Sequence, residues 1–111
     1  MIILNIRATD NIQDYLDIVE QNGGGILNLA VATYNLADDL TIPTLTTLNG
    51  NGATLDFGGT AHGVKIIGTS MNRIQNPSLT QITITNSSDI GVEVAYTDNP
   101  ILNLFDNVLL S

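Results

Sequence analysis

Three acidic residues, Asp56, Asp89 and Glu93, are the candidates for chemistry on a sugar. Glycoside hydrolysis needs two carboxyl groups about 5 to 10 Å apart. Asp56 and Glu93 each stand in an alternating segment, so their side chains are expected to point away from the core. The three carboxylates could then meet only across neighbouring strands or neighbouring chains. The alternative is that they are solvated charges on strand faces, which discourage edge pairing.

The adjacent carboxylates of Asp38 and Asp39 are the candidate metal ligands. Calcium takes six or more oxygen ligands, so this pair could supply only part of a site. The other interpretation is that the pair caps the turn before Leu40. We expect no cofactor and no resident metal, and calcium is the one candidate that these residues offer.

Aromatic and basic residues offer fewer candidates. Tyr96 ends a predicted strand and could stack on a sugar ring, whereas Tyr34 is expected to be structural. His62 is interpreted as a turn histidine between two strands. Lys65 stands one repeat before Glu93, which predicts a cross-strand ion pair.

Length and charge restrict the partners. The chain has 111 residues, enough for one domain with a core, and 3 Lys+Arg against 11 Asp+Glu give a net charge of −8. Phosphate binding needs clustered Lys and Arg, so we expect no nucleic-acid partner. No apolar run approaches the ~20 residues of a membrane span, so no membrane association is expected. The lack of cysteine excludes disulfides and thiol catalysis.

The composition favours a β protein. Charged residues make up 13% of the chain, well below the ~25% of ordinary domains, while 13 Asn, 13 Thr and 10 Gly are present. Asn and Gly are residues that turns use, and Thr suits strands.

One amphipathic helix is predicted near the start of the chain, within residues 9–22. Apolar residues recur at i, i+3, i+4 and i+7 from Ile12 to Val19. Asp10 is the expected N-cap, with Gln13 completing a capping box. Gly23, Gly24 and Gly25 are expected to end this helix.

Beyond residue 25 the chain repeats short alternating segments. The first column contains residues 26–29, 54–57, 81–84 and 107–110, at offsets of 28, 27 and 26. A second column contains 39–42, 63–66 and 91–94, and a third contains 45–48, 73–75 and 101–104. Three short strands per period predict a coil in which each strand pairs in parallel with its counterpart one turn later, at about 4.8 Å.

Two further expectations depend on this register. The spacing of Asn49, Asn76 and Asn103 would allow an asparagine ladder at one corner. Residues 69–78 form an excursion or an irregular side, in which Met71 and Pro77 lie on the surface or fill a corner. Phe57 and Phe105 are expected in the core or at an interface.

Several segments together resemble the opening of the pectate-lyase-like right-handed parallel β-helix superfamily. They are 9–13 (TDNIQ), 24–29 (GGILNL), 32–34 (ATY), 40–42 (LTI) and 48–56 (LNGNGATLD). The resemblance implies an all-β fold, a right-handed parallel β-helix of about three and a half turns from residue 26 to 111, capped by the N-terminal helix. The closest likeness in style is to bacteriophage tailspikes, tail fibres and surface polysaccharide lyases and hydrolases.

The catalytic motifs of that superfamily are not matched. Its lyases use acidic calcium ligands with a basic residue, and its polygalacturonase-type hydrolases use clustered Asp, Gly-His-Gly and Arg-x-Lys. Ala61-His62-Gly63 and Arg73-Ile74-Gln75 are similar to the last two in order only. The spacing is too short and no Asp pair precedes them.

The resemblance also implies a partner. Members of the superfamily have more turns, and the last segment here has no capping element. We therefore expect a fragment of a longer protein or an end covered by another subunit. Tailspike helices are usually parallel trimers, which predicts a homotrimer at a virion tail or another extracellular surface.

Three functions remain open on these grounds. The first is a structural or adhesion module that contacts a surface polysaccharide weakly. The second is the N-terminal part of a polysaccharide lyase or hydrolase, with catalytic residues on later turns or between subunits. The third is a designed or excised folding unit without activity of its own.

Overall fold

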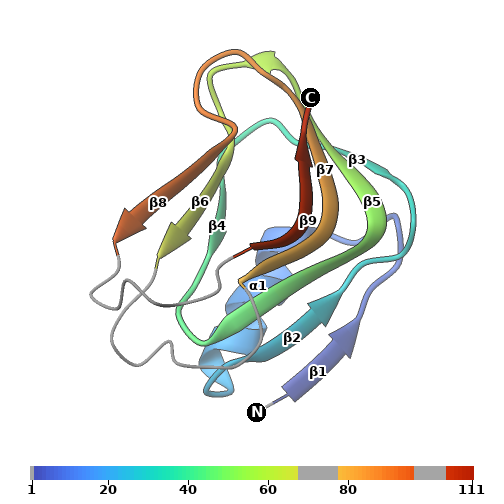
Figure 1. Ribbon diagram of the computed structural model, residues 1–111. Helices are drawn as coiled ribbons and strands as arrows, with labels where there is room; N and C mark the ends of the chain where they lie inside the picture. The colour runs from blue at the N-terminus through green and yellow to red at the C-terminus, as the bar shows by residue number, and fades with distance from the viewer. Residues whose placement is uncertain (1, 68–77, 97–104) are drawn as a thin grey trace.

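A computed structural model describes residues 2–67, 78–96 and 105–111, in which one short helix accompanies two sheets (Figure 1). The elements in chain order are β1 (Ile2–Asn5), α1 (Ile12–Gln21), β2 (Gly25–Asn28), β3 (Thr33–Asn35), β4 (Leu40–Ile42), β5 (Thr46–Thr60), β6 (Val64–Ile67), β7 (Leu79–Ser87), β8 (Val92–Tyr96) and β9 (Phe105–Leu110).

The strands form a larger and a smaller sheet. The larger sheet has the order β1-β2-β5-β7-β9, with β3 also paired to β5, and the smaller sheet has the order β4-β6-β8. Every strand pair in the described part of the chain is parallel. From β3 onward the chain passes alternately from one sheet to the other. The fold is therefore mostly β, with two all-parallel sheets and one short N-terminal helix.

The larger sheet bends along a row of stacked corners. Asn51, Gln81 and Asn107 all have a positive φ, of 53°, 51° and 57°, and each interrupts the pairing of its strand. Figure 1 shows β5, β7 and β9 curving side by side as a result. Asn accepts this left-handed conformation more readily than most residues. The expectation that Asn turns the corners is confirmed at two of these positions.

The core lies between the two sheets and is built from columns of aliphatic residues in register. Leu27, Leu48 and Leu79 are consecutive partners in one column and are fully buried. Leu55 and Ile84 continue a second column, and Ile42 and Ile66 form a third in the smaller sheet. Each column repeats the same side-chain position from strand to strand, which is how parallel in-register pairing fills an interior.

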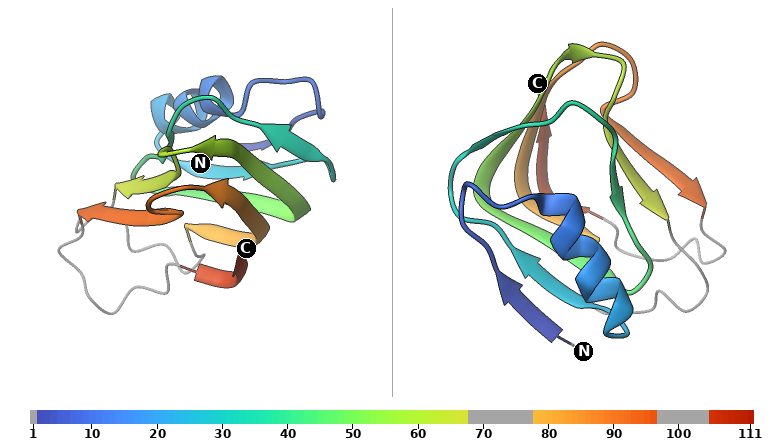
Figure 2. Two further views of the ribbon diagram at one scale, coloured as in Figure 1. Left: turned by 90° about the horizontal axis from the view of Figure 1, so that it is seen from above. Right: turned by 180° about the vertical axis from the view of Figure 1, so that it is seen from behind.

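Helix α1 closes one end of this core. Ile12, Leu16 and Val19 are buried, as the apolar stripe predicts, and Tyr15 packs against the same cluster while partly exposed. Figure 2 shows α1 at one end of the stacked strands, with β8 and β9 at the other end. Burial of such a stripe is the main source of stability for a short helix.

The predicted cap of α1 was wrong by one residue. Asn11 is the N-cap, and its Oδ1 accepts a hydrogen bond from the Asp14 backbone N–H at 3.0 Å. Asp10 instead accepts from the Arg7 backbone N–H at 2.8 Å, which makes a turn ahead of the helix. Asp and Asn are equally good caps, so composition alone does not choose between neighbours.

Gln13 does not complete a capping box but binds the edge of the smaller sheet. Its Nε2 donates to the Thr41 carbonyl oxygen at 3.0 Å, and its Oε1 accepts from the Thr41 N–H at 2.8 Å. The side-chain amide thus occupies the place of a peptide group from one more strand. In this way α1 covers both the core and a strand edge.

The repeat predicted for the smaller sheet is confirmed. Leu40 pairs with Val64, and Val64 pairs with Val92. The segments 39–42, 63–66 and 91–94 therefore occupy equivalent positions on successive strands.

In the larger sheet the predicted register is partly wrong. Ile26 pairs with Thr47 rather than with residue 54, because residues 45–48 open the long strand β5 instead of forming a separate strand. Leu55 pairs with Ile84, two residues beyond the expected partner. A shift of two residues keeps the same side of the strand facing the core, so the inward pattern survives. The expected alignment of 81–84 with 107–110 is confirmed.

An asparagine ladder exists, but with different members. Asn28 Nδ2 donates to Asn5 Oδ1, and Asn49 Nδ2 donates to Asn28 Oδ1, both at 3.0 Å. The next partner of Asn49 is Thr80, not the predicted Asn76. Residues 68–77 and 97–104 lie outside the described part of the chain, and with them the expectations for Met71, Pro77 and Asn103 and for the third-column segments 73–75 and 101–104.

Candidate functional site

Three of the predicted site residues line one hollow beside the smaller sheet. Asp39 precedes β4, Asp89 precedes β8, and Glu93 lies on β8. The hollow has a volume of about 250 Å³. We call it the carboxylate hollow, and it is lined by Asp39, Ala61, Gly63, Val64, Lys65, Asp89, Ile90 and Glu93.

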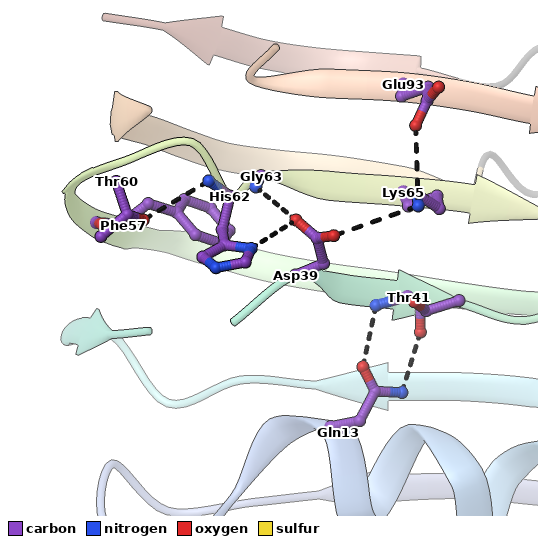
Figure 3. Close-up of polar contacts among 9 residues, drawn as sticks. All are labelled: Gln13, Asp39, Thr41, Phe57, Thr60, His62, Gly63, Lys65 and Glu93. Carbon is purple, nitrogen blue, oxygen red and sulfur yellow. Dashed lines mark hydrogen bonds and ion pairs between the residues drawn. The ribbon is translucent and has the colours of Figure 1, made fainter. Parts of the chain in front are cut away.

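Asp39 is held by the turn that follows β5 (Figure 3). Its Oδ1 accepts a hydrogen bond from the Gly63 backbone N–H at 3.0 Å and lies 3.2 Å from His62 Nδ1. The Gly63 N–H, followed by His62 and the charge of Lys65, lowers the pKa of the Asp39 carboxyl below its ordinary value of 3.8. The Asp39 carboxyl is therefore ionised at neutral pH, and its oxygens already face donor groups of the protein itself.

Lys65 stands between two carboxylates on the outer face of the smaller sheet. Its Nζ lies 4.0 Å from Asp39 Oδ2 and 3.9 Å from Glu93 Oε2, and Lys65 and Glu93 are register partners on β6 and β8. The predicted cross-strand ion pair is confirmed. Pairs this exposed contribute about 0.2–1 kcal/mol.

His62 lies in the turn between β5 and β6, as predicted. Its backbone N–H donates to Thr60 Oγ1 at 3.4 Å, and Thr60 Oγ1 donates to the Phe57 carbonyl oxygen at 2.8 Å. Together with the contact to Asp39, these bonds fix the turn.

Asp56 lies on the larger sheet and does not line the carboxylate hollow. Its Oδ1 accepts from Asn86 Nδ2 at 3.0 Å and from the Gly58 N–H at 2.8 Å. The Asn86 amide, followed by the Gly58 N–H, lowers the pKa of this carboxyl below 3.8. Asp56 is thus separated from Asp89 and Glu93, with which it was grouped in the sequence.

The two neighbouring carboxylates at 38 and 39 face different surroundings. Asp38 lines a hollow of about 630 Å³ between the start of α1 and the segment from β3 to β4. Asp39 borders that hollow too, but both of its oxygens face His62, Gly63 and Lys65. Within residues 2–67, 78–96 and 105–111, no group of three or more His, Cys, Asp or Glu is arranged to hold a metal ion.

The aromatic residues differ in their surroundings. Tyr34 is buried, its hydroxyl donates to the Ala30 carbonyl oxygen at 2.8 Å, and burial raises the pKa of the phenol. Phe57 is fully buried and Phe105 is exposed. The backbone of Tyr96 pairs with Ile67, but its side chain is outside the described part, so its ligand-binding role stays a prediction.

Two contacts were missed by reasoning from the sequence. The first is the bond from the Gly63 N–H to Asp39; the second-column register already placed residues 39 and 63 side by side and could have suggested it. The second is the double hydrogen bond between Gln13 and Thr41, for which the sequence carries no signal, because it depends on where the helix lies on the sheet.

No helix in the described ranges combines the length and hydropathy needed to cross a membrane. Comparison of the chain with protein-family models, with curated proteins and with solved structures finds no significant match.

Proposed function

We propose that this chain is a structural and adhesion module, built as a short right-handed parallel β-helix that α1 caps at one end. The alternation of the chain between two parallel sheets supports this architecture, as do the stacked corners and the columns of register partners. Modules of this kind serve bacteriophage tailspikes, tail fibres and similar surface proteins, and we place this chain among them at a virion tail or another extracellular surface.

The observation that carries the structural role is the state of the carboxylates. Asp39 and Asp56 both have a lowered pKa and both accept hydrogen bonds from the protein's own backbone and side chains. A general acid in glycoside hydrolysis requires the opposite, a raised pKa that keeps its proton near neutral pH. These acids therefore suit a scaffold better than a proton donor.

A weak contact with glycans fits the outer face of the larger sheet. Thr33, Thr54 and Thr83 are consecutive partners on β3, β5 and β7, and each is at least partly exposed. Such a row of hydroxyl groups offers donors and acceptors for sugar hydroxyls. Charged residues make up only 13% of the chain, and outer strand faces with few charges suit side-by-side packing of three parallel copies. We therefore propose a homotrimer.

The test measures the turnover of polysaccharides and the molar mass of the protein in solution. Purified protein is incubated with acidic and neutral polysaccharides, with and without calcium, and its molar mass is measured by light scattering. We expect no turnover and the mass of a trimer. A monomer at micromolar concentration would refute the trimer, and turnover that disappears in Glu93→Gln would refute the inert module.

A second function is favoured by one observation. Asp89 and Glu93 line the same hollow, so two carboxylates from one loop and strand approach a common space. The chain would then be the N-terminal part of a polysaccharide lyase or hydrolase. Turnover lost in both Glu93→Gln and Asp89→Asn, but kept in Asp56→Asn, would establish this alternative.

A further inference from the structure

The end of the molecule opposite α1 leaves its core uncovered by the described residues. In the larger sheet, the column through buried Leu27, Leu48 and Leu79 ends at Phe105, which is 41% exposed. The column through buried Leu55 and Ile84 ends at Leu110, which is 57% exposed. Both terminal residues lie on β9, the last strand in the order of its sheet.

The smaller sheet ends in the same way. Ile42 and Ile66 are fully buried, whereas their partner Val94 on β8 is 37% exposed. Ile90, which precedes β8, is exposed as well. Within the described part of the chain, β8 pairs only with β6 and β9 only with β7. The last strands of the two sheets, β8 and β9, therefore both lie at the end of the molecule away from α1 (Figure 2).

The charges that the described residues place around this end are mostly acidic. Asp89, Glu93 and Asp106 are all exposed on or beside β8 and β9, and Lys65 is the base that pairs with one of them, Glu93. A basic partner is attracted to such a rim, and another acidic surface is repelled.

We propose that this open end binds an extended polypeptide segment of another protein, which adds to β9 as a further parallel strand. The segment alternates apolar and polar residues, so that its apolar side chains continue the positions of Val108 and Leu110, which lie beyond the corner at Asn107. Lysine or arginine flanks pair with the acidic rim. Main-chain hydrogen bonds then supply affinity and the alternating side chains supply specificity, as in other cases of strand addition. This inference goes beyond the scaffold role and does not depend on it.

A second copy of the chain fits this end less well. Two copies meeting through their open ends would bring the same acidic rims together on chains that each carry a net charge of −8. Head-to-tail stacking of copies is blocked because α1 covers the opposite end with Leu16 and Val19 buried beneath it. A basic segment meets neither obstacle.

The experiment uses a synthetic peptide as the probe. The intact protein is titrated with the fluorescently labelled peptide Lys-Lys-Thr-Val-Thr-Val-Thr-Lys-Lys, followed by anisotropy at low and high salt. Of two matched peptides, one replaces all lysines with glutamate, and the other replaces the central threonine with proline, which cannot donate a backbone hydrogen bond to a strand. We expect binding of the lysine peptide alone, weakened at high salt because ionic strength screens exposed charges.

Variants of the protein locate the site. Leu110→Ser should weaken binding about tenfold, since it removes most of an apolar side chain from the contact. Val31→Ser, at an exposed valine between β2 and β3, is the matched control and should leave binding unchanged. Removing rim charge with Glu93→Gln and Asp106→Asn together should lower both affinity and salt dependence, whereas Asp17→Asn with Glu20→Gln on α1 should not.

Hydrogen exchange of the backbone amides then shows which strand the peptide joins. Binding should protect the backbone amides of β9 and leave those of β1 unchanged, while thermal melting confirms that each variant is folded. The proposal is overturned if the lysine peptide does not bind, if the glutamate peptide binds equally, or if protection appears at β1. It is also overturned if light scattering shows that Leu110→Ser breaks apart an assembly of identical copies, because the open end would then be occupied by the protein itself.

Discussion

The same columns of core residues run between the two ends of this molecule, but they are covered by a helix at one end and exposed at the other. At the first end, α1 lays Ile12, Leu16 and Val19 over the core, and Gln13 bonds both backbone groups of Thr41 on the edge of β4. At the other end, the columns finish in exposed side chains on β8 and β9. A stack of parallel strands does not close itself. Closure requires an element of another kind, and in the described part of the chain only the first end has one.

The same contrast appears between two glycines of one column. A Cβ on Gly63 would collide with the backbone carbonyl oxygen of Ile90 and crowd that of Gly91. A Cβ on Gly91, its counterpart on the next strand, would meet only the side chains of Leu110, at 3.5 Å, and Ile84. The backbone at Gly63 is packed tightly by the segment ahead of β8, whereas Gly91 has no such backbone neighbour among the described residues.

The largest effect is expected where α1 meets the core. Leu16→Ala should destabilise the protein by about 2–5 kcal/mol, because it leaves a cavity beneath a fully buried leucine. Leu110→Ala, the same change at the open end, should stay within about 0.5 kcal/mol. The measurement is the urea midpoint of unfolding, followed by circular dichroism. Equal losses at both ends would mean that the open end is covered in the isolated protein.

The glycine pair gives the next largest effect. Gly63→Ala should lower the free energy of unfolding by about 1–3 kcal/mol, since overpacking forces the backbone apart. Gly91→Ala should change it by no more than about 0.5 kcal/mol. The two urea curves measured side by side test this difference. A loss for Gly91→Ala as large as that for Gly63→Ala would contradict the open packing around Gly91 at the start of β8.

A smaller effect is expected at the strand edge that the helix covers. Gln13→Ala removes two hydrogen bonds to Thr41 and should destabilise the protein by about 1–2 kcal/mol. Gln13→Glu keeps the acceptor for the Thr41 N–H but places a carboxylate oxygen against the Thr41 carbonyl, so it should rescue only part of the loss. Full rescue by glutamate would show that the donated bond contributes nothing.

The smallest effect is expected from the carboxylate between the two ends. The pKa of Asp39 is lowered in the folded protein, so its contribution to stability is fully present above its ordinary value of 3.8 and is lost as pH falls through the folded pKa. Asp39→Asn should therefore flatten the acid decline in stability below about pH 4, by well under 1 kcal/mol, because the group is exposed. Glu20→Gln, on the outer face of α1, is the charge-matched control. Thermal melting at pH values from 2 to 7 checks both variants, and an unchanged acid decline in Asp39→Asn would contradict the role of the Gly63 bond.

Parts of the fold could be predicted because the local pattern and the long-range packing agree. The apolar stripe from Ile12 to Val19 has the period of an α-helix and one buried side, so the helix can be predicted from the spacing alone. The smaller sheet has short strands of similar spacing, so Lys65 and Glu93 could be paired from the register alone. The bend at Asn51 was also within reach, because Asn and Gly favour corners.

Other parts could not be predicted, because several arrangements satisfy the same local preferences. β1 has four alternating residues and no turn signal around it, so nothing marks it as a strand before it is paired with β2. The continuous strand β5 absorbs the corner at Asn51 and Gly52, and this shifts its partners relative to a regular repeat. The asparagine ladder accordingly runs from Asn49 to Asn28 and Asn5, on the earlier strands, and the partner of Asn49 on β7 is Thr80. The carboxylate hollow likewise depends on how neighbouring strands and loops pack, which the spacing of residues in the sequence does not reveal.

The parallel pairing also has a kinetic consequence. Each pairing joins segments well separated in sequence, such as Leu27 with Leu48 and Val64 with Val92, so a loop must close before any of these contacts forms. Among the elements of residues 2–67, 78–96 and 105–111, α1 alone can form from local interactions. We expect slow folding for a chain of this size, since domains dominated by non-local pairing fold in milliseconds to seconds. The helix and the strands beside it would then supply the template on which the later strands add in order.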